Sequence, residues 1–236
     1  MRVVSLVPSV TETLLAWGVE PVAVTRFCEQ GERFPTVGGT KNPDIAAIEA
    51  LRPDLVIVCD QENRRPDAEA LTASGVTVHV IHITSIDHVG PEMARLAVTL
   101  GRPETLGNAC AAPAVAGSAA QRRAFVPIWR RPWMTLNKDT YAMTLLGLIG
   151  IVGVADDDNN PYPEITLDEV RARGVDLVIA PNEPYEFGEH HRPELSTVAP
   201  VTFVDGKDLF WWGVRTRYAV ARLSDVLAHP TSRSES

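Results

Sequence analysis

Two acidic loops, one in each half of the chain, carry the side chains best suited to hold a ligand. Glu62 follows the apolar run 55–59, with Asn63 and Arg64 beside it, and Glu183 follows the similar run 177–181. Carboxylate, amide and guanidinium groups orient the polar edges of ligands, and two converging glutamates can also exchange protons. The loops therefore favour binding, with acid–base catalysis or a plain solvated loop as alternatives.

A glycine turn supplies a second candidate binding element. Gly39, Thr40, Lys41 and Asn42 stand directly before a predicted helix. Backbone amides in such a turn and the start of the helix favour an anionic or carbonyl group. The spacing is not that of a phosphate-binding Walker motif. A simple helix-entry turn is the alternative interpretation.

Aromatic residues are concentrated in the second half, because only Trp17, Phe27 and Phe34 precede Phe125. Large rings in loops suit a flat, partly apolar ligand such as a corrin or a porphyrin, and packing between loops is the alternative. We expect apolar ligand contacts from Phe27, Trp133, Tyr162, Tyr185, Phe187, Trp211 and Trp212, with Arg215 as a polar contact.

Metal-ligating patterns are weak. The three cysteines form no CxxC pair, and Cys28 is the one weak candidate for a thiolate ligand. His79 and His82 lie three apart on a predicted strand, so their side chains point to opposite faces and exclude a shared metal. No intrinsic cofactor is expected.

Strand-like and helix-like segments alternate along the chain, which predicts an α/β fold with parallel sheets. The run Asp54–Ile57 reappears as Asp176–Ile179, each after a helical segment, so two similar lobes are expected. Ser9 and Glu12 predict a capping box for the first helix. The predicted organisation is 1–84 for the first lobe, 85–123 for a helical connection, 124–228 for the second lobe and 229–236 for a flexible tail.

Composition narrows the classes of partner. The chain has 236 residues and a formal net charge of −8, which argues against nucleic acid as a partner. No apolar run reaches the length of a membrane span. The start at Met1 lacks the pattern of a signal peptide, which predicts a cytoplasmic protein; the alternative is an exported protein whose signal has been removed.

The sequence resembles the helical-backbone metal receptor family, the substrate-binding proteins for vitamin B12, haem and siderophores. The resemblance extends from Arg2 to about Leu227, and its strongest segments are 2–18, 37–58 and 162–170. A subgroup without export signals is similar at 38–43, 61–64, 129–135, 182–187 and 211–215.

This resemblance implies a class III periplasmic-binding-protein fold, with two Rossmann-like lobes joined by a connecting helix and a ligand cleft between the lobes. It also implies a partner, an ABC permease whose arginines receive one glutamate from each lobe of the B12-binding members. The second lobe keeps Asp168 and Glu169, whereas the first carries Ala46 and Ala47, so one docking anchor is absent.

The function predicted from these features is to hold a cobalamin-like corrinoid, haem or another metal chelate in the cleft without turnover. Three alternatives stay open. They are a transport receptor whose signal peptide was removed, a cytoplasmic enzyme or metallochaperone that uses Glu62 and Glu183 with Cys28, and a module whose aromatic cleft takes a peptide.

Overall fold

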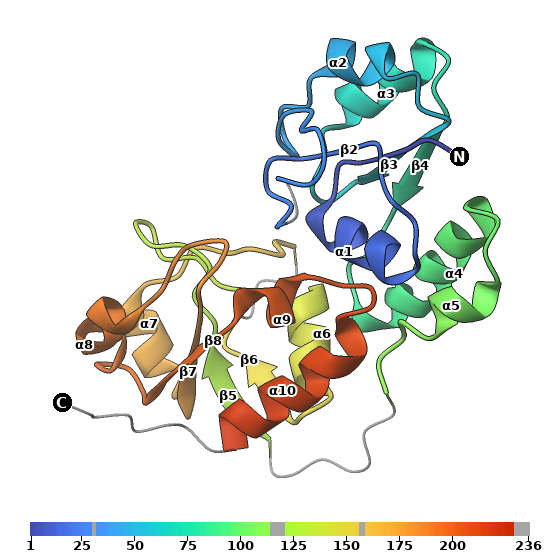
Figure 1. Cartoon of the computed structure of the whole chain (residues 1–236). Helices are drawn as coiled ribbons and strands as arrows, with labels where there is room; N and C mark the ends of the chain where they lie inside the picture. Colours follow the sequence, from blue (N-terminus) through green and yellow to red (C-terminus); the bar gives the residue numbers. More distant parts are fainter. Residues whose placement is uncertain (30–31, 114–120, 156–158, 229–236) are drawn as a thin grey trace. The chain divides into compact units, whose positions relative to one another are not determined.

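The chain folds into two compact units. The structure, a computed structural model, describes residues 1–29, 32–113, 121–155 and 159–228. Unit 1 comprises 1–111 together with the short segment 211–216, and unit 2 comprises 112–210 together with the chain from 217 onward. Figure 1 shows an open sheet covered by helices in each unit.

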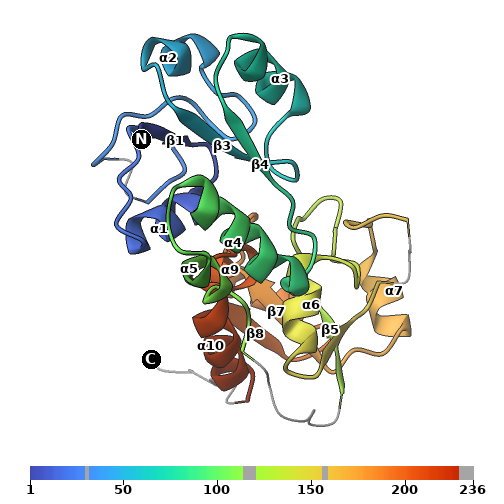
Figure 2. The same cartoon turned by 90° about the vertical axis from the view of Figure 1, so that its right-hand side faces the viewer.

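Unit 1 contains a parallel four-stranded sheet with the strand order β2-β1-β3-β4. Its strands are β1 (Val3–Ser5), β2 (Ala23–Val24), β3 (Leu55–Cys59) and β4 (Val78–Ile81). Its helices are α1 (Pro8–Ala16), α2 (Ile45–Ala50), α3 (Arg65–Ala73), the 3-10 turn η1 (Ile86–His88), α4 (Val89–Thr99) and α5 (Glu104–Asn108). Helices α2 and α3 cover one face of the sheet, and α1, α4 and α5 cover the other (Figures 1 and 2).

Unit 2 repeats this topology, because its strand order is β6-β5-β7-β8 and every pair is parallel. Its strands are β5 (Arg122–Phe125), β6 (Ile151–Gly153), β7 (Leu177–Pro181) and β8 (Val201–Val204). Its helices are α6 (Tyr141–Gly147), α7 (Leu167–Ala172), the 3-10 turn η2 (Glu189–His191), α8 (Arg192–Leu195), α9 (Gly206–Phe210) and α10 (Thr216–Ala228). The predicted α/β fold with two parallel-sheet lobes is confirmed.

The repeat extends to single hydrogen bonds. Asp54, just before β3, accepts the backbone N–H of Arg2 at 2.5 Å, and the Arg2 guanidinium donates to the carbonyl of Leu51 at 2.8 Å. In unit 2, Asp176 accepts the N–H of Arg123 at 2.7 Å, and the Arg123 guanidinium donates to the Arg173 carbonyl at 3.3 Å. The aspartate before each central strand thus sets the same register with the first strand of its unit.

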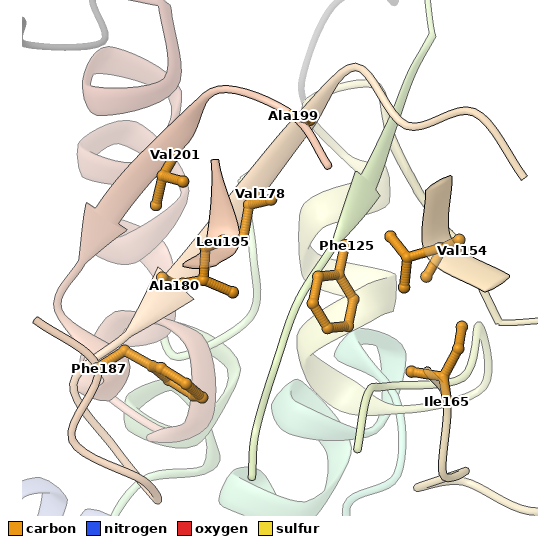
Figure 3. Close-up of a cluster of buried hydrophobic side chains, with 10 residues drawn as sticks. Phe125, Val154, Ile165, Val178, Ala180, Phe187, Leu195, Ala199 and Val201 are labelled. Carbon is orange, nitrogen blue, oxygen red and sulfur yellow. The ribbon is translucent and has the colours of Figure 1, made fainter. Parts of the chain in front are cut away.

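Apolar side chains from alternate strand positions build each core. On the α2–α3 face of unit 1, Val56 and Val58 pack with Ile48 and Leu71. Figure 3 shows the matching cluster of unit 2, where Phe125 and Val178 lie among residues of α7, α8 and the neighbouring loops. Burial on both faces explains why β3 and β7 read as continuous apolar runs.

Side chains bind outward-facing backbone groups at one edge strand of each sheet, β4 in unit 1 and β8 in unit 2. In unit 1 the Val80 carbonyl accepts from Arg95, and the His82 N–H donates to Glu92 Oε2 at 3.2 Å. In unit 2, Arg192 donates to the carbonyl of Val201 at 2.9 Å. These contacts satisfy groups that would otherwise be free to pair with another strand.

Two local predictions need correction. The capping box at Ser9 and Glu12 is wrong, because Pro8 occupies the first turn of α1 and no side chain caps it. The predicted connection over 85–123 contains η1, α4 and α5, which belong to unit 1, and β5 begins at Arg122. Residues 114–120 and the predicted tail 229–236 lie outside the described residues.

Candidate functional site

The carboxyl ends of the unit 1 strands carry most of the predicted polar site. Parallel strands end at one edge of the sheet, which places the loops after β2 and β3 near each other. The glycine turn joins them there: the Arg26 N–H donates to the Gly38 carbonyl at 2.9 Å, and the Gly39 N–H donates to the Asn42 carbonyl at 3.1 Å. Gly38 has φ 85°, and a Cβ on it would lie 2.5 Å from the Asn42 oxygen, so this tight turn requires glycine.

Phe27 presents an exposed ring at this edge. Its side chain is 53% exposed, and the Arg26 guanidinium lies 4.9 Å from the ring centroid. Gly39 packs against the pair, since a Cβ there would lie 3.0 Å from Phe27 Cε2. The glycine turn therefore supports a cation–aromatic pair that faces solvent.

Asn63 has a structural role instead of the predicted ligand contact. It is buried, and its side chain accepts the Cys59 N–H at 2.8 Å and donates to the carbonyls of Leu6 at 3.2 Å and Thr40 at 2.8 Å. The amide thereby ties the glycine turn to the ends of β1 and β3. Its hydrogen-bonding groups are used inside unit 1, which leaves little for a ligand.

A line of polar contacts continues from the glycine turn towards β4. Lys41 Nζ lies 3.5 Å from the Gln61 carbonyl oxygen, and the Gln61 amide donates to Asp60 Oδ1 at 3.3 Å. Asp60 Oδ2 in turn contacts His82 Nδ1 at 2.7 Å. Predicted and unpredicted residues thus form one continuous polar strip across the carboxyl edge of the unit 1 sheet.

Glu62 and Arg64 border this strip. Glu62 is half-buried in the turn after β3, where its N–H donates to the Cys59 carbonyl at 3.1 Å. Arg64 precedes α3 and forms a two-point ion pair with Asp67, at 2.9 and 3.1 Å. A cavity of about 600 Å³ opens beside them, between α3 and β4, and its lining includes Asp60, Asn63 and Arg64.

The start of α2, expected to favour an anionic or carbonyl group, is already capped by a carboxylate of the chain. Asp44 caps this helix, and its carboxylate accepts the Ala47 N–H at 3.0 Å. A carboxylate already satisfies the positive helix terminus, so a second anion there would be repelled. Lys41 and Asn42 remain exposed.

Cys28 lies in a cluster of hydroxyl groups. Its buried sulfur contacts the Thr11 Oγ1 at 3.2 Å and the Thr25 Oγ1 at 3.4 Å. Across the described residues, no three histidine, cysteine, aspartate or glutamate side chains gather closely enough to hold a bare metal ion. The structure gives no support to Cys28 as a metal ligand.

The segment 211–216 is held by α1. Arg215 donates to both carboxylate oxygens of Glu12, at 3.0 and 2.7 Å, and the Val214 N–H donates to Thr13 Oγ1 at 3.2 Å. The predicted ligand contact of Arg215 is therefore replaced by an internal ion pair. Trp212 is only 4% exposed and offers almost no surface, whereas Trp211 is half-buried.

Most predicted aromatic contacts of unit 2 pack together. Trp133 stacks on Phe187 with centroids 5.9 Å apart, and Tyr185 lies 4.7 Å from Phe187. Phe187 is 3% exposed and belongs to the hydrophobic core (Figure 3), so its predicted ligand contact needs correction. Trp129, which meets Tyr185 edge to face at 5.5 Å, is 46% exposed.

The remaining predicted residues of unit 2 lie on loops. Tyr162 is exposed, on the segment that precedes α7. Glu183 is half-buried after β7 and packs against Gly206, where a Cβ would lie 2.5 Å from Glu183 Cγ. Gly206 is thus needed for the close approach of the loops after β7 and β8, which Asn182 also joins by accepting the Gly206 N–H at 2.7 Å.

The acidic residues on α7 have different roles. Glu169 completes a capping box with Thr166, and these hydrogen bonds lower the pKa of its carboxyl group. Asp168 points outward, 91% exposed, and pairs with Arg171. Both lie on a groove of about 510 Å³ whose lining also includes Trp133.

Arg26, Trp129 and His82 were not among the predicted contact residues. Arg26 precedes the predicted contact Phe27, and Trp129 begins the 129–135 segment, so proximity to a strand end was the available signal. The spacing of His82 from His79 bears only on a shared metal and gave no signal for His82 alone. The structure leaves His79 buried and His82 exposed, on opposite faces as expected.

Comparisons with known proteins agree with this architecture. No family model matches the chain. The vitamin B12-binding protein of Salmonella paratyphi A is 28% identical over 189 residues, which cover 75% of this chain and 71% of the relative.

Solved structures extend the likeness to nearly the full length. The periplasmic vitamin B12 binding protein BtuF of Vibrio cholerae has a TM-score of 0.76 at 20% identity and covers 98% of both chains. The periplasmic heme-binding protein RhuT from Roseiflexus sp. RS-1 has a TM-score of 0.77 at 18% identity, over 95% of this chain and 96% of its own. At such identities, the structural likeness establishes the fold.

Proposed function

We propose, from the class III periplasmic-binding-protein fold that the chain shares with these neighbours, that it binds a planar metal chelate and releases it unchanged. A cobalamin-like corrinoid is the favoured ligand class, and haem is the second. The curated relative and the two solved neighbours are named for these two ligands.

The exposed Phe27 ring beside Arg26 and the glycine turn is the observation that carries this proposal. An exposed phenylalanine at the carboxyl edge of a parallel sheet is apolar surface in the usual ligand-binding position of such folds. A flat macrocycle would cover the ring, while its polar substituents would meet the Arg26 and Lys41 cations.

The proposed contacts retain most residues predicted from the sequence. In unit 1 the polar strip and its border supply Phe27, Gly39, Thr40, Lys41, Asn42, Glu62 and Arg64, and the segment 211–216 supplies Trp211. In unit 2 the loops at the equivalent edge of the sheet supply Trp133, Tyr162, Glu183 and Tyr185. Trp129 is added to these proposed contacts because its side chain is exposed. Asn63, Phe187, Trp212 and Arg215 act through packing and hydrogen bonding instead.

Equilibrium titration of intrinsic tryptophan fluorescence with cyanocobalamin and with haemin tests the proposal. Phe27→Ala is expected to weaken binding about ten-fold, because a covered aromatic ring contributes on the order of 1–2 kcal/mol. Tyr218→Ala is the matched control: Tyr218 is 56% exposed and carries the Arg217 guanidinium 5.3 Å from its ring, but it lies on α10. Its affinity should stay within about two-fold of wild type.

Flat titrations with both ligands would remove the proposed ligand class. Equal losses for Phe27→Ala and Tyr218→Ala would show that the carboxyl edge of unit 1 is not the binding surface. A slow conversion of the bound chelate, seen by chromatography of the released ligand, would instead favour the enzyme that uses Glu62 and Glu183.

Delivery to an ABC permease after export is the second candidate role. Both solved neighbours are periplasmic binding proteins, which favours the exported alternative over the cytoplasmic expectation. In unit 2, Asp168 is exposed enough to meet a partner, whereas Glu169 is engaged in its capping box. Recovery of the protein expressed from its complete gene in the osmotic-shock fraction would support export, and recovery in the cytosol alone would refute it.

Addition of a peptide strand at β4 or at β8 is disfavoured by side chains that bind outward backbone groups there. Arg95, Glu92 and Arg192 already bind the outward backbone groups that an added strand would need.

None of the helices in the described ranges combines the length and apolar character that crossing a membrane requires.

A further inference from the structure

We propose that His82 coordinates the metal of the bound chelate through its Nε2 atom. This inference rests on the proposed function and adds one specific bond to it. The ligand chemistry required is a planar metal chelate with an exchangeable axial position, which both corrinoids and haem can provide.

The hydrogen bond to Asp60 fixes the chemical form of His82. Asp60 Oδ2 lies 2.7 Å from His82 Nδ1, and a carboxylate only accepts hydrogen bonds, so Nδ1 carries the proton. The lone pair of a neutral imidazole then resides on Nε2. A carboxylate behind the ring is the usual support of a metal-binding histidine, because it fixes the ring and strengthens the donor nitrogen.

The surroundings hold this pair in place. The Asp60 N–H donates to the Ile81 carbonyl at 3.1 Å, and the Gln61 amide donates to the second Asp60 oxygen at 3.3 Å. The backbone N–H of His82 is bound by Glu92 at 3.2 Å. Both residues are therefore fixed at the ends of β3 and β4, while the His82 side chain stays 53% exposed.

The neighbouring His88 has the opposite arrangement. Its ring centroid lies 5.7 Å from that of His82, but its Nδ1 accepts the Thr84 N–H at 3.4 Å. In the neutral ring, Nε2 of His88 then carries the proton and has no free lone pair. His88 is therefore a close control that shares the location but lacks the donor.

His82 is continuous with the proposed binding surface. The polar strip links it through Asp60 and Gln61 to Lys41, at the glycine turn that supports Phe27. A chelate brings its own equatorial donors, so one axial donor from the protein is sufficient. In the proposed step the His82 Nε2 lone pair replaces a metal-bound water, which leaves as water, and the oxidation state of the metal is unchanged.

Visible absorption of untagged protein tests this bond. Wild type is titrated with aquacobalamin and haemin, whose metals exchange axial water, and with cyanocobalamin, whose axial positions are filled by cyanide and the nucleotide base. The expected result is an imidazole-coordinated spectrum with aquacobalamin or haemin, and the chelate that gives it identifies the source. His82→Ala should abolish that spectrum and weaken binding of that chelate at least ten-fold, a larger loss than that of cyanocobalamin, whose metal has no free position for His82.

Three further variants sharpen the result. His82→Gln should behave as His82→Ala and covers the case in which alanine disturbs the loop, as judged by circular dichroism. Asp60→Asn should weaken binding of the coordinated chelate about ten-fold. His88→Ala should keep both the spectrum and the affinity.

The possible outcomes separate this inference from the proposed function. Binding of the chelates without an imidazole spectrum, or a spectrum that survives in His82→Ala, overturns the coordination and leaves the proposed function standing. If wild type binds none of the three chelates, the proposed function and this inference both fall.

Discussion

Acidification should destabilise unit 1 through one buried histidine. His79 is 5% exposed on β4, and its Nδ1 contacts Thr99 Oγ1 at 3.1 Å. Burial, and secondarily the positive charge of Arg95, lower the His79 pKa to about 4, against a smaller opposing effect of Glu92. The neutral imidazole is therefore strongly preferred in the folded protein.

The sign and size of the effect follow from this pKa. The unfolded chain binds a proton at this histidine below a pKa of about 6.5, whereas the folded protein does so only near 4. Between these values the unfolded state holds more protons, so stability falls as the pH falls through this window. The loss from this group amounts to about 2 kcal/mol at pH 5 and approaches about 3.4 kcal/mol well below pH 4.

Urea unfolding followed by circular dichroism at about pH 7.5 and pH 5 measures this contribution. His79→Gln keeps a hydrogen-bonding side chain and removes the titration. The difference in unfolding free energy between wild type and His79→Gln should shift by about 2 kcal/mol in favour of the variant on going to pH 5. His190→Gln, which removes an exposed histidine, should show a shift of less than about 0.5 kcal/mol.

A shift below about 0.5 kcal/mol for His79→Gln would refute this reasoning. It would mean that the His79 ring reaches water or a proton acceptor in the folded protein. A shift of equal size for His190→Gln would assign the acid sensitivity to general charge repulsion instead of burial.

Urea unfolding also checks the remaining predictions. Asn63→Ala should lower the free energy of unfolding by about 3 kcal/mol, because the three hydrogen bonds of the Asn63 side chain within unit 1 are lost. A loss below about 1 kcal/mol would contradict the structural role of Asn63. Gly213→Ala should cost more than about 2 kcal/mol, because φ is 106° and a Cβ would lie 2.2 Å from a threonine hydroxyl of α1. Gly18→Ala, with φ 69° and open space, should cost only about 1 kcal/mol, and equal costs would exclude the clash. A double-mutant cycle of Glu12→Gln and Arg215→Met should give a coupling of about 1–2 kcal/mol, and a value near zero would contradict an ion pair that fastens the segment.

The fold was predictable because its strands and helices follow from sequence patterns that are periodic and local. Alternating strand and helix patterns specify parallel sheets, and the repeated aspartate before β3 and β7 marks the same register in both units. The capping box predicted for α1 is wrong, because Ser9 fits such a box in sequence but Pro8 begins the first turn one residue earlier. Strand β5 ends at Phe125, shortly before Pro127, which has no N–H to donate to a neighbouring strand.

The site was predictable only in part, because position and exposure are different properties. Phe27, Gly39 and Lys41 follow predicted strands, and they lie at one edge of the unit 1 sheet. Whether a polar side chain faces solvent or the protein depends on partners that are remote in sequence. Asn63 binds backbone groups up to 57 residues away, and Arg215 binds Glu12 from 203 residues away.

The segment 211–216 has a consequence for how the chain folds during synthesis. Its bonds to α1 join residues 201 and 203 positions apart, so α1 lacks these partners until residue 215 has been made. Contacts of such long range are late and slow to form, since the intervening chain must first be ordered. An N-terminal fragment that stops at Ala111 would lack these bonds to α1, so unit 1 reaches its final form only when the segment 211–216 returns to it.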